Sequence, residues 1–190
     1  MKYFIMFGPP GAGKGTHAAA LVEKFNLKHI STGELLRSEI AAGTELGKQA
    51  QALIEKGDFV PDVVVEGMIA NTFAANPHVK GFLLDGFPRT IQQAIDLDEM
   101  LESRDEYVTG VISLMIPDEV IKERIKGRAM IEGRADDAND ETIANRIRTY
   151  HAKTEPLIEI YKEKGVYHEI NGVGSIPEVE KRVIDLMDTL

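Results

Sequence analysis

The sequence of 190 residues contains no cysteine and no tryptophan, and its five histidines are scattered along the chain. Without cysteine there is no disulfide and no thiolate ligand, so we expect no structural zinc. No apolar run approaches the ~18 residues that a membrane span requires, and the N-terminus lacks the basic and apolar regions of a secretion signal. These absences predict a cytoplasmic protein that has no membrane partner.

Positive charge is also in short supply. The chain has 22 lysines and arginines against 31 aspartates and glutamates, which gives a formal net charge of −9. Proteins that bind nucleic acid neutralise many phosphates with basic residues, so this balance argues against a nucleic-acid partner. With 43% hydrophobic residues the chain can bury a sizeable core, and we expect a single domain with small inserts.

A glycine-rich segment, residues 8–16, carries the clearest chemical signal. It reads Gly-Pro-Pro-Gly-Ala-Gly-Lys-Gly-Thr and lies between an apolar run at residues 3–7 and a stretch with helical spacing. Glycines allow successive backbone N–H groups to approach an anion, a helix N-terminus favours negative charge, and Lys14 adds a mobile cation. The general pattern has Ser or Thr directly after the lysine, whereas here Gly15 intervenes before Thr16. We predict a phosphate-binding loop at residues 8–16.

Short apolar runs alternate with longer amphipathic stretches, which is typical of βαβ units and a parallel sheet with helices on both faces. We predict five strands, at residues 2–7, 27–30, 81–85, 108–115 and 166–169. Helices are expected between the strands, and capping-type sequences at residues 31–34 and 90–93 mark two of their starts. Residues 127–139 are polar and have no clear period, so we predict a mobile loop there.

Charged residues near these elements point to further phosphate contacts. Asp85 stands at the carboxyl end of a buried strand, where open α/β sheets gather ligands, although a capping role for its carboxylate is the alternative. Arg89 begins a helix, where a cation opposes the helix dipole unless an anion compensates for it. Arg124 and Arg128 are four residues apart, so on a continuous helix they repel each other without an anion between them.

Four segments together resemble the adenylate kinase family: the phosphate-binding loop, Ile-Ser-Thr-Gly-Glu-Leu-Leu-Arg at 30–37, Asp-Gly-Phe-Pro-Arg-Thr at 85–90 and Gly-Arg-Ala-Asp-Asp at 133–137. The resemblance covers essentially the whole chain. It implies an α/β, three-layer fold of the P-loop NTPase type with a five-stranded parallel sheet. It also implies a helical AMP-binding insert at residues 31–60 and a short lid at residues 127–137, on a core formed by 1–30, 61–126 and 138–190.

The activity implied by the resemblance is the reversible transfer of the terminal phosphoryl group from Mg·ATP to AMP, which gives two ADP. Mg²⁺ is expected to arrive with ATP, without a direct protein ligand and with Asp85 acting through water. The family also implies a monomer whose insert and lid close over the nucleotides, so that water cannot accept the phosphoryl group.

The resemblance assigns site residues position by position. The ATP-binding residues would be Gly11, Ala12, Gly13, Lys14, Gly15, Thr16, Arg128 and Gly174. The AMP-binding residues would be Thr32, Arg37, Asp58, Phe59, Val60, Gly86, Phe87, Pro88, Arg89, Gln93, Arg134 and Arg146. The catalytic residues, which would neutralise the charge on the transferring group, would be Lys14, Arg89, Arg124, Arg134 and Arg146. Arg37 and Arg89 would hold the AMP phosphate, and Gln93 would read the edge of the adenine.

Some positions have open interpretations. Asp136 and Asp137 could hold Arg134 and the lid hinge, or could equally form a turn or cap before the helix expected near Asn139. His17, in the first turn after the loop, reads equally as a solvated residue and as a nucleotide contact, and it is assigned no role.

Two alternative functions have to be weighed. A UMP/CMP kinase shares the loop, the lid and the reaction, but that sister group tends to have Ala and Asn where this chain has Thr32 and Thr90. A nucleotide-dependent switch binds one nucleotide, and arginines at positions 37, 89, 134 and 146 are too many for a single triphosphate. The sequence does not fix the base of the donor, so GTP stays open beside ATP.

Overall fold

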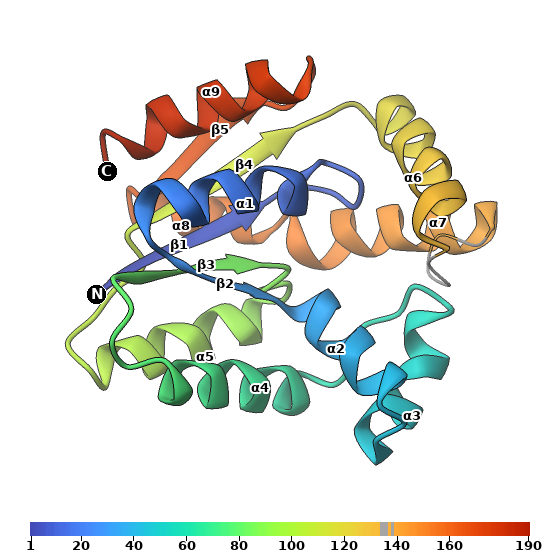
Figure 1. Ribbon diagram of the computed structural model, residues 1–190, viewed down its shortest axis with the longest axis horizontal. Helices are drawn as coiled ribbons and strands as arrows, with labels where there is room; N and C mark the ends of the chain where they lie inside the picture. The colour runs from blue at the N-terminus through green and yellow to red at the C-terminus, as the bar shows by residue number, and fades with distance from the viewer. Residues whose placement is uncertain (134–136, 138) are drawn as a thin grey trace.

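The computed structural model describes residues 1–133, 137 and 139–190, and Figure 1 draws the others as a thin grey trace. Five strands form one parallel sheet: β1 (Lys2–Phe7), β2 (Lys28–Ser31), β3 (Gly81–Asp85), β4 (Gly110–Met115) and β5 (Tyr167–Asn171). Their order across the sheet is β2-β3-β1-β4-β5. All five predicted strands are confirmed, and their ends differ by at most two residues from the prediction.

Helices cover both faces of the sheet, so the predicted three-layer α/β fold is confirmed (Figure 1). One face is covered by α1 (Lys14–Phe25) and α9 (Ile176–Met187). The other is covered by α4 (Asp62–Ala75), α5 (Ile91–Glu102) and α8 (Leu157–Glu163). The remaining helices are α2 (Thr32–Ala41), α3 (Glu45–Ile54), α6 (Asp118–Glu132), α7 (Asp140–Thr149) and the short π-helix η2 (Tyr150–Thr154). Among the described residues, no helix has the length and apolar character needed to cross a membrane.

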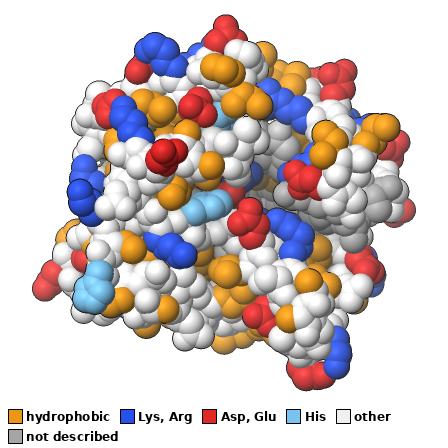
Figure 2. Space-filling model, viewed as in Figure 1, with side chains coloured by type: hydrophobic (Ala, Val, Ile, Leu, Met, Phe, Trp, Pro, Cys, Tyr) orange, Lys and Arg blue, Asp and Glu red, His pale blue; other side chains and the backbone are white. Residues whose placement is uncertain are grey.

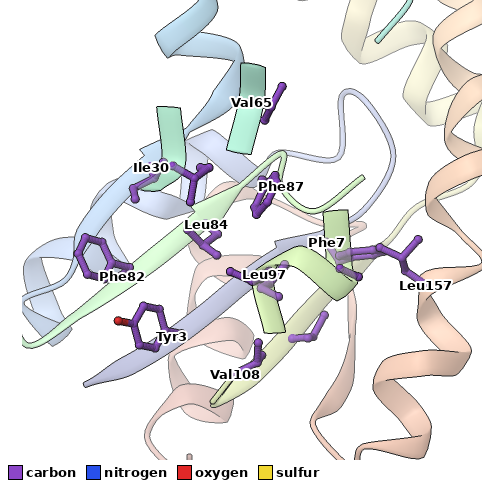
Figure 3. Close-up of a cluster of buried hydrophobic side chains, with 14 of the residues drawn as sticks. Tyr3, Phe7, Ile30, Val65, Phe82, Leu84, Phe87, Leu97, Val108 and Leu157 are labelled. Atoms are coloured by element: carbon purple, nitrogen blue, oxygen red, sulfur yellow. The ribbon is translucent and has the colours of Figure 1, made fainter. Parts of the chain in front are cut away.

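The central strand β1 explains the apolar run at the start of the sequence. Tyr3, Ile5 and Phe7 belong to the hydrophobic cluster under α4, α5 and α8, whereas Phe4 and Met6 belong to the cluster under α1 and α9. Successive side chains of a strand point to opposite faces, and here both faces are covered. Figure 3 shows part of the first cluster, in which Tyr3 and Phe7 lie among side chains of neighbouring strands and helices. Every position of the strand interior is therefore apolar.

The parallel register determines where the loops of the molecule meet. Met6 of β1 and Ser31 of β2 both pair with Asp85 at the end of β3. The phosphate-binding loop after β1, the start of α2 after β2 and the segment after β3 therefore begin side by side at the carboxyl edge of the sheet. Ligands of open α/β sheets bind at this edge.

Side-chain caps start two helices where the sequence predicted them. Ser31 Oγ accepts a hydrogen bond from the backbone N–H of Glu34 at 3.4 Å, and Thr90 Oγ1 accepts one from the N–H of Gln93 at 3.1 Å. Each cap satisfies a backbone donor that the first helical turn leaves without an intrahelical partner. The caps fix the starts of α2 and α5 at the same edge of the sheet.

The loop predicted at residues 127–139 is wrong over its first half, because α6 continues to Glu132 and ends at Gly133, where φ is 60°. The buried residues of this helix are Ile121 and Ile125, both in its first half, so the second half lacks the apolar period that would reveal a helix. A glycine inside a helix costs only ~1 kcal/mol, and Ala129 is a strong helix former. Residues 134–136 and 138 lie outside the described residues.

Three carboxylates lie where α4 packs against α5. Asp62 and Glu66 belong to α4, and Asp96 belongs to α5. Glu66 Oε1 is buried and has no hydrogen-bond partner among the described residues. Burial, and then the neighbouring carboxylates of Asp96 and Asp62, raise the pKa of Glu66 to about 7. The folded protein therefore binds a proton here that the unfolded chain releases at lower pH.

This proton should make the stability of the fold depend on pH. Because the folded pKa of Glu66 lies above its ordinary value of 4.5, its stabilising contribution is complete below that value and is lost as the pH rises through about 7. We expect Glu66→Gln to raise the free energy of unfolding by about 1 kcal/mol at pH 8 and by much less at pH 5. Urea unfolding of both proteins between these pH values measures the effect, and a pH-independent difference would contradict it.

Candidate active site

A cavity of about 430 Å³ opens at the carboxyl edge of the sheet. Its walls come from the phosphate-binding loop, the start of α2, residues 54–60, residues 85–93 and side chains of α6, α7 and η2. In Figure 2 the surface is hollowed to the right of centre, with Lys and Arg side chains beside the hollow. The cationic residues that line the cavity are Lys14, Arg37, Arg89, Arg128 and Arg146. Such a lining suits phosphate groups.

Lys14 reaches back over the phosphate-binding loop. Its ammonium donates to the carbonyl oxygens of Gly8 at 2.9 Å and Pro9 at 3.0 Å, which leaves one of its three N–H groups for a ligand. Burial lowers the pKa of Lys14 to about 8; the charge of Asp85 opposes this shift, and the nearby arginines add to it. A desolvated cation among other cations favours the approach of an anion.

The loop requires glycine at several positions, and Gly13 and Gly11 show why. Gly13 immediately precedes α1 with a φ of 95°, in the left-handed region that side chains rarely adopt. Gly11 has a φ of 79°, and a Cβ there would stand 2.9 Å from Ile125 Cγ1. The bare backbone lets the loop turn tightly into the N-terminus of α1, where unpaired N–H groups can meet a phosphate.

Asp85 faces the loop from the end of β3. Its Oδ2 lies 3.7 Å from His29 Nε2, and 3.7 Å from the place a Cβ on Gly15 would occupy. Burial alone would raise the pKa of Asp85, but its interactions with His29, Lys14 and Arg89 outweigh burial and lower the pKa. An ionised carboxylate beside a phosphate-binding loop fits the oxygen ligands that hydrated Mg²⁺ prefers. No group of three potential metal ligands occurs among the described residues.

Arg89 and Thr32 meet at one backbone carbonyl on the opposite wall of the cavity. Gly86 O accepts hydrogen bonds from Arg89 Nε at 2.7 Å and from Thr32 Oγ1 at 2.9 Å. Gly86 has a φ of 80°, and a Cβ there would lie 2.6 Å from Arg89 Nη2 and 2.7 Å from Thr32 Oγ1. Glycine at this position therefore permits the close approach of all three residues.

The backbone of Arg89 is held on both sides. Its N–H donates to Gln93 Oε1 at 2.7 Å, and its carbonyl accepts from Thr154 Oγ1 at 2.8 Å. Gln93 in turn donates from Nε2 to Asp62 Oδ1 at 2.7 Å. The guanidinium of Arg89 thus projects from a fixed backbone.

Phe59 brings residues 58–60 against the same wall. The Arg89 guanidinium carbon and the Lys153 ammonium nitrogen each lie 5.5 Å from the centre of the Phe59 ring. Two cations on one aromatic ring attract it by cation–π interactions. Of the predicted segment, Asp58, Phe59 and Val60 all line the cavity.

Arg128 and Arg146 meet at one buried carboxylate. Arg128 Nε and Nη2 donate to Asp137 Oδ2 at 2.7 Å and Oδ1 at 2.9 Å, and Arg146 Nη1 also donates to Oδ1. The Asp137 side chain is 0% exposed. Asn139, and not Asp137, caps α7. Asp137 therefore holds Arg128 and Arg146 and does not cap α7, whereas the predicted contact with Arg134 involves a residue outside the described ones, as does the prediction for Asp136.

Arg124 lies beside the phosphate-binding loop and does not line the cavity. α6 is continuous between Arg124 and Arg128, but Arg124 donates to the carbonyl oxygens of Ala12 at 3.3 Å and Gly172 at 3.0 Å. Neither Arg124 nor Gly174 is among the residues that line the cavity. Arg124 ties the phosphate-binding loop to the segment that joins β5 and α9.

Comparison with known proteins places this chain in a family. The family described as adenylate kinase matches residues 6–166. An adenylate kinase of Flavobacterium psychrophilum is 46% identical over 190 residues, the full length of both chains. An adenylate kinase of Leptospira biflexa is 46% identical, and the match covers 97% of this chain and 98% of the relative. An adenylate kinase of Xylella fastidiosa is 43% identical, and the match covers 95% of this chain and 96% of the relative.

The chain belongs to the adenylate kinase family. It is therefore an enzyme of the nucleoside monophosphate kinase class, and the family membership counts against both the UMP/CMP kinase and the nucleotide switch. The residues that this family resemblance singled out come largely to one cavity. Those that line it are Gly11, Gly13, Lys14, Gly15, Thr16, Thr32, Arg37, Asp58, Phe59, Val60, Gly86, Pro88, Arg89, Gln93, Arg128 and Arg146.

Two of the residues predicted to bind nucleotide lie beneath the wall of the cavity. Ala12 and Phe87 are 0% and 1% exposed, so their side chains pack in the core while their backbone helps to shape the loops. His17 is also buried, at 4% exposed, and its interpretation as a solvated residue is wrong. Its Nδ1 has no hydrogen-bond partner among the described residues, and burial lowers its pKa. Packing of the first turn of α1 inside the molecule causes this burial.

Sequence reasoning missed several residues at the site, and three of them support its geometry. Tyr150 and Thr154 of η2 line the cavity, and Asp62 supports Gln93 from behind it. A π-helical turn often marks a functional site, but nothing in the local sequence announces one. Asp62 follows a proline and begins a helix, which predicts only a favourable charge at a helix N-terminus.

The depressed pKa of Lys14 should appear as proton uptake on nucleotide binding. With a free pKa of about 8, a large fraction of Lys14 is neutral at pH 8.5, and a bound phosphate favours the charged form. We expect Mg·ATP to bind with uptake of roughly half a proton or more at pH 8.5 and almost none at pH 6.5. Calorimetry in buffers of different ionisation enthalpy measures this, with Lys14→Arg as the variant that cannot titrate; equal uptake in that variant would contradict the assignment.

Removal of the Asp137 carboxylate should destabilise the fold. Asp137→Ala leaves Arg128 and Arg146 without the buried carboxylate, and we expect the free energy of unfolding to fall by about 3 kcal/mol. Lys126→Ala is the matched control, because it breaks an exposed ion pair with Asp140 and should change stability by less than about 1 kcal/mol. Urea unfolding of wild type and both variants measures these changes. If Asp137→Ala lowers the free energy of unfolding no more than Lys126→Ala does, the role of Asp137 is contradicted.

Proposed function

We propose that this chain catalyses the reversible transfer of the terminal phosphoryl group from Mg·ATP to AMP, giving two ADP, and that both nucleotides meet in the cavity described above. One observation carries the proposal. Lys14 of the phosphate-binding loop and Arg37, Arg89, Arg128 and Arg146, from other elements, line a single cavity. A single triphosphate occupies the loop side, and cations on the opposite wall provide for a second phosphate-bearing molecule.

The donor side is built on the phosphate-binding loop. Residues 11–16 and Arg128 would bind the ATP phosphates, and Gly174 would lie beside its base. The left-handed Gly13 and the open N-terminus of α1 support this role, because they leave backbone N–H groups available to phosphate oxygens. When bound with ATP, Mg²⁺ would supply positive charge to the phosphates, and Asp85 would hold its water ligands.

The acceptor side is built on Thr32, Arg37, residues 58–60, residues 86–89, Gln93 and Arg146. Arg37 and Arg89 would hold the AMP phosphate, and the base would lie toward Gln93. The fixed backbone of Arg89 supports this role, because an arginine that is positioned before binding loses little freedom on binding. Arg134, which lies outside the described residues, is proposed to join this group on the strength of the resemblance alone.

Catalysis would consist of positioning and charge neutralisation. An AMP phosphate oxygen is already anionic, so it can attack without a general base, and no protein nucleophile is needed. Lys14, Arg89, Arg124, Arg134 and Arg146 are the proposed catalytic cations, with Arg124 acting through its contact with the loop. The insert at 31–60 and the lid at 127–137 would close to exclude water. A monomeric state and a cytoplasmic location stay predictions from the sequence.

The proposal is tested by measuring ADP formation from Mg·ATP with AMP, CMP, UMP or no acceptor. We expect strong turnover with AMP and very little without an acceptor. Lys14→Ala and Arg89→Ala should each lower kcat/KM by about a thousandfold, because each removes a cation that neutralises the transferring phosphoryl group.

Arg148→Ala is the control for these variants. Arg148 is exposed on α7, two residues from Arg146, and its side chain contacts Asn145. Its removal should leave turnover within about twofold of wild type. Near-normal activity of the Lys14 or Arg89 variant, with circular dichroism showing folded protein in every case, would contradict the site assignment.

A further inference from the structure

We propose that Asp62 fixes the orientation of the Gln93 side-chain amide, and that this fixed amide makes the acceptor site select a base with an amino group beside an unprotonated ring nitrogen. The inference rests on the proposed function, which places the acceptor base at Gln93. Asp62 does not line the cavity, so it is a positioning residue that acts through Gln93.

Each end of the Gln93 amide has a different partner. Nε2 donates to Asp62 Oδ1 at 2.7 Å, and Oε1 accepts from the backbone N–H of Arg89 at 2.7 Å. The other carboxylate oxygen of Asp62 accepts from Thr90 Oγ1 at 3.2 Å. Gln93 is 2% exposed, yet it lines the cavity. The amide is therefore buried and bonded at both ends at the place where a ligand can meet it.

These partners exclude the reversed amide. An ionised carboxylate only accepts hydrogen bonds, and a backbone N–H only donates. Rotation of the Gln93 amide by half a turn would set its oxygen against the Asp62 carboxylate and its NH₂ group against the Arg89 N–H. Both hydrogen bonds would become repulsive contacts in a buried site. The bond to Asp62 is charge-assisted, so it contributes the larger part of this preference.

A fixed amide can distinguish bases that a rotating amide cannot. After its two internal bonds, Gln93 retains one N–H and one acceptor lone pair for a ligand. Adenine offers an amino donor beside a ring-nitrogen acceptor, whereas hypoxanthine and guanine offer a carbonyl acceptor beside a ring N–H donor. An amide of fixed sense matches one of these edges and opposes the other. If it could turn over, it would match either.

The position of Asp62 links this selection to the fold. Asp62 is the first residue of α4, directly after residues 58–60 of the acceptor wall, and Thr90 is the N-cap of α5. The carboxylate therefore bonds across the starts of two helices, at a site that also favours negative charge. Glu66 and Asp96 are the neighbouring carboxylates in the α4–α5 contact. Neither forms a described hydrogen bond with Gln93, so Asp96 provides a control for charge alone.

The test compares AMP with IMP, which differ at the purine edge in question. Steady-state kcat and KM are measured for both acceptors with wild type, Asp62→Ala, Asp62→Asn and Asp96→Asn. The ratio of the two kcat/KM values does not depend on the fraction of folded enzyme, which separates selectivity from stability. In Asp62→Ala we expect the AMP-to-IMP ratio to fall about tenfold or more, through KM, with kcat for AMP within about threefold of wild type.

The other variants give contrasting expectations. Asp62→Asn should recover only part of the ratio, because its Oδ1 can still accept from Nε2 but the Asn amide is uncharged and can itself turn over. Asp96→Asn should retain the wild-type ratio. A ratio in Asp62→Ala within twofold of wild type would overturn the inference. Gln93→Leu separates this failure from a failure of the proposed function. If the AMP-to-IMP ratio is also unchanged in Gln93→Leu, Gln93 does not contact the base and the proposed acceptor site is wrong. If the ratio is lost in Gln93→Leu but not in Asp62→Ala, only the role of Asp62 is wrong.

A second measurement needs no alanine variant. In a proton–nitrogen spectrum of the wild-type enzyme, the Gln93 side-chain NH₂ signal is identified by its loss in Gln93→Leu. We expect one of its protons to be shifted downfield by the Asp62 carboxylate, to move in Asp62→Asn and to stay in place in Asp96→Asn. An unshifted NH₂ pair in wild type would overturn the inference.

Discussion

Among the described residues, five cationic side chains line one cavity in a chain whose formal net charge is −9. Cations that are close together repel each other, and this repulsion adds to burial, which is the larger cause, in lowering the pKa of Lys14. The protein offsets this repulsion with local acceptors: loop carbonyls hold Lys14, a carbonyl after β3 holds Arg89, and Asp137 holds Arg128 and Arg146. These contacts hold the cationic side chains in position before an anion binds.

The parallel sheet makes this concentration of charge possible. Because Met6 and Ser31 both pair with Asp85, three chain segments that are distant in sequence begin at the same edge. Apolar clusters cover both faces of the sheet, which leaves its carboxyl edge as the place where polar loops converge. Outside the cavity the acidic surface disfavours long polyanions, while the cavity favours small ones.

Buried carboxylates and amides then give the cations and the base-facing groups their orientation. Asp137 sets the positions of two arginines, and Asp62 holds Gln93, which holds the backbone of Arg89. These supporting residues act on other side chains of the protein and not directly on a ligand. They act because side chains with several rotatable bonds become precise only when their far ends are bonded.

Much of the molecule could be predicted from the sequence, and the reasons are local. The interiors of the strands at 2–7 and 81–85 are apolar because both faces of the sheet are covered, and Ser31 and Thr90 cap the helices that they precede. The second half of α6 could not be predicted, because its apolar side chains Met130 and Ile131 are exposed and show no period of buried positions. The burial of His17 could not be predicted either, because the sequence of one helical turn does not reveal whether that turn faces water or the core.

The sequence by itself was enough to predict the position of the phosphate-binding loop, the succession of the strands along the chain and the family. Each of these is encoded by neighbouring residues or by motifs in a fixed order. Tertiary structure alone decided that Asp137 joins Arg128 to Arg146, that Arg124 turns toward Gly172, and that Asp62 meets Gln93. The last pair is 31 residues apart on separate helices. Such contacts depend on how whole elements pack against one another, and no local spacing of residues specifies that packing.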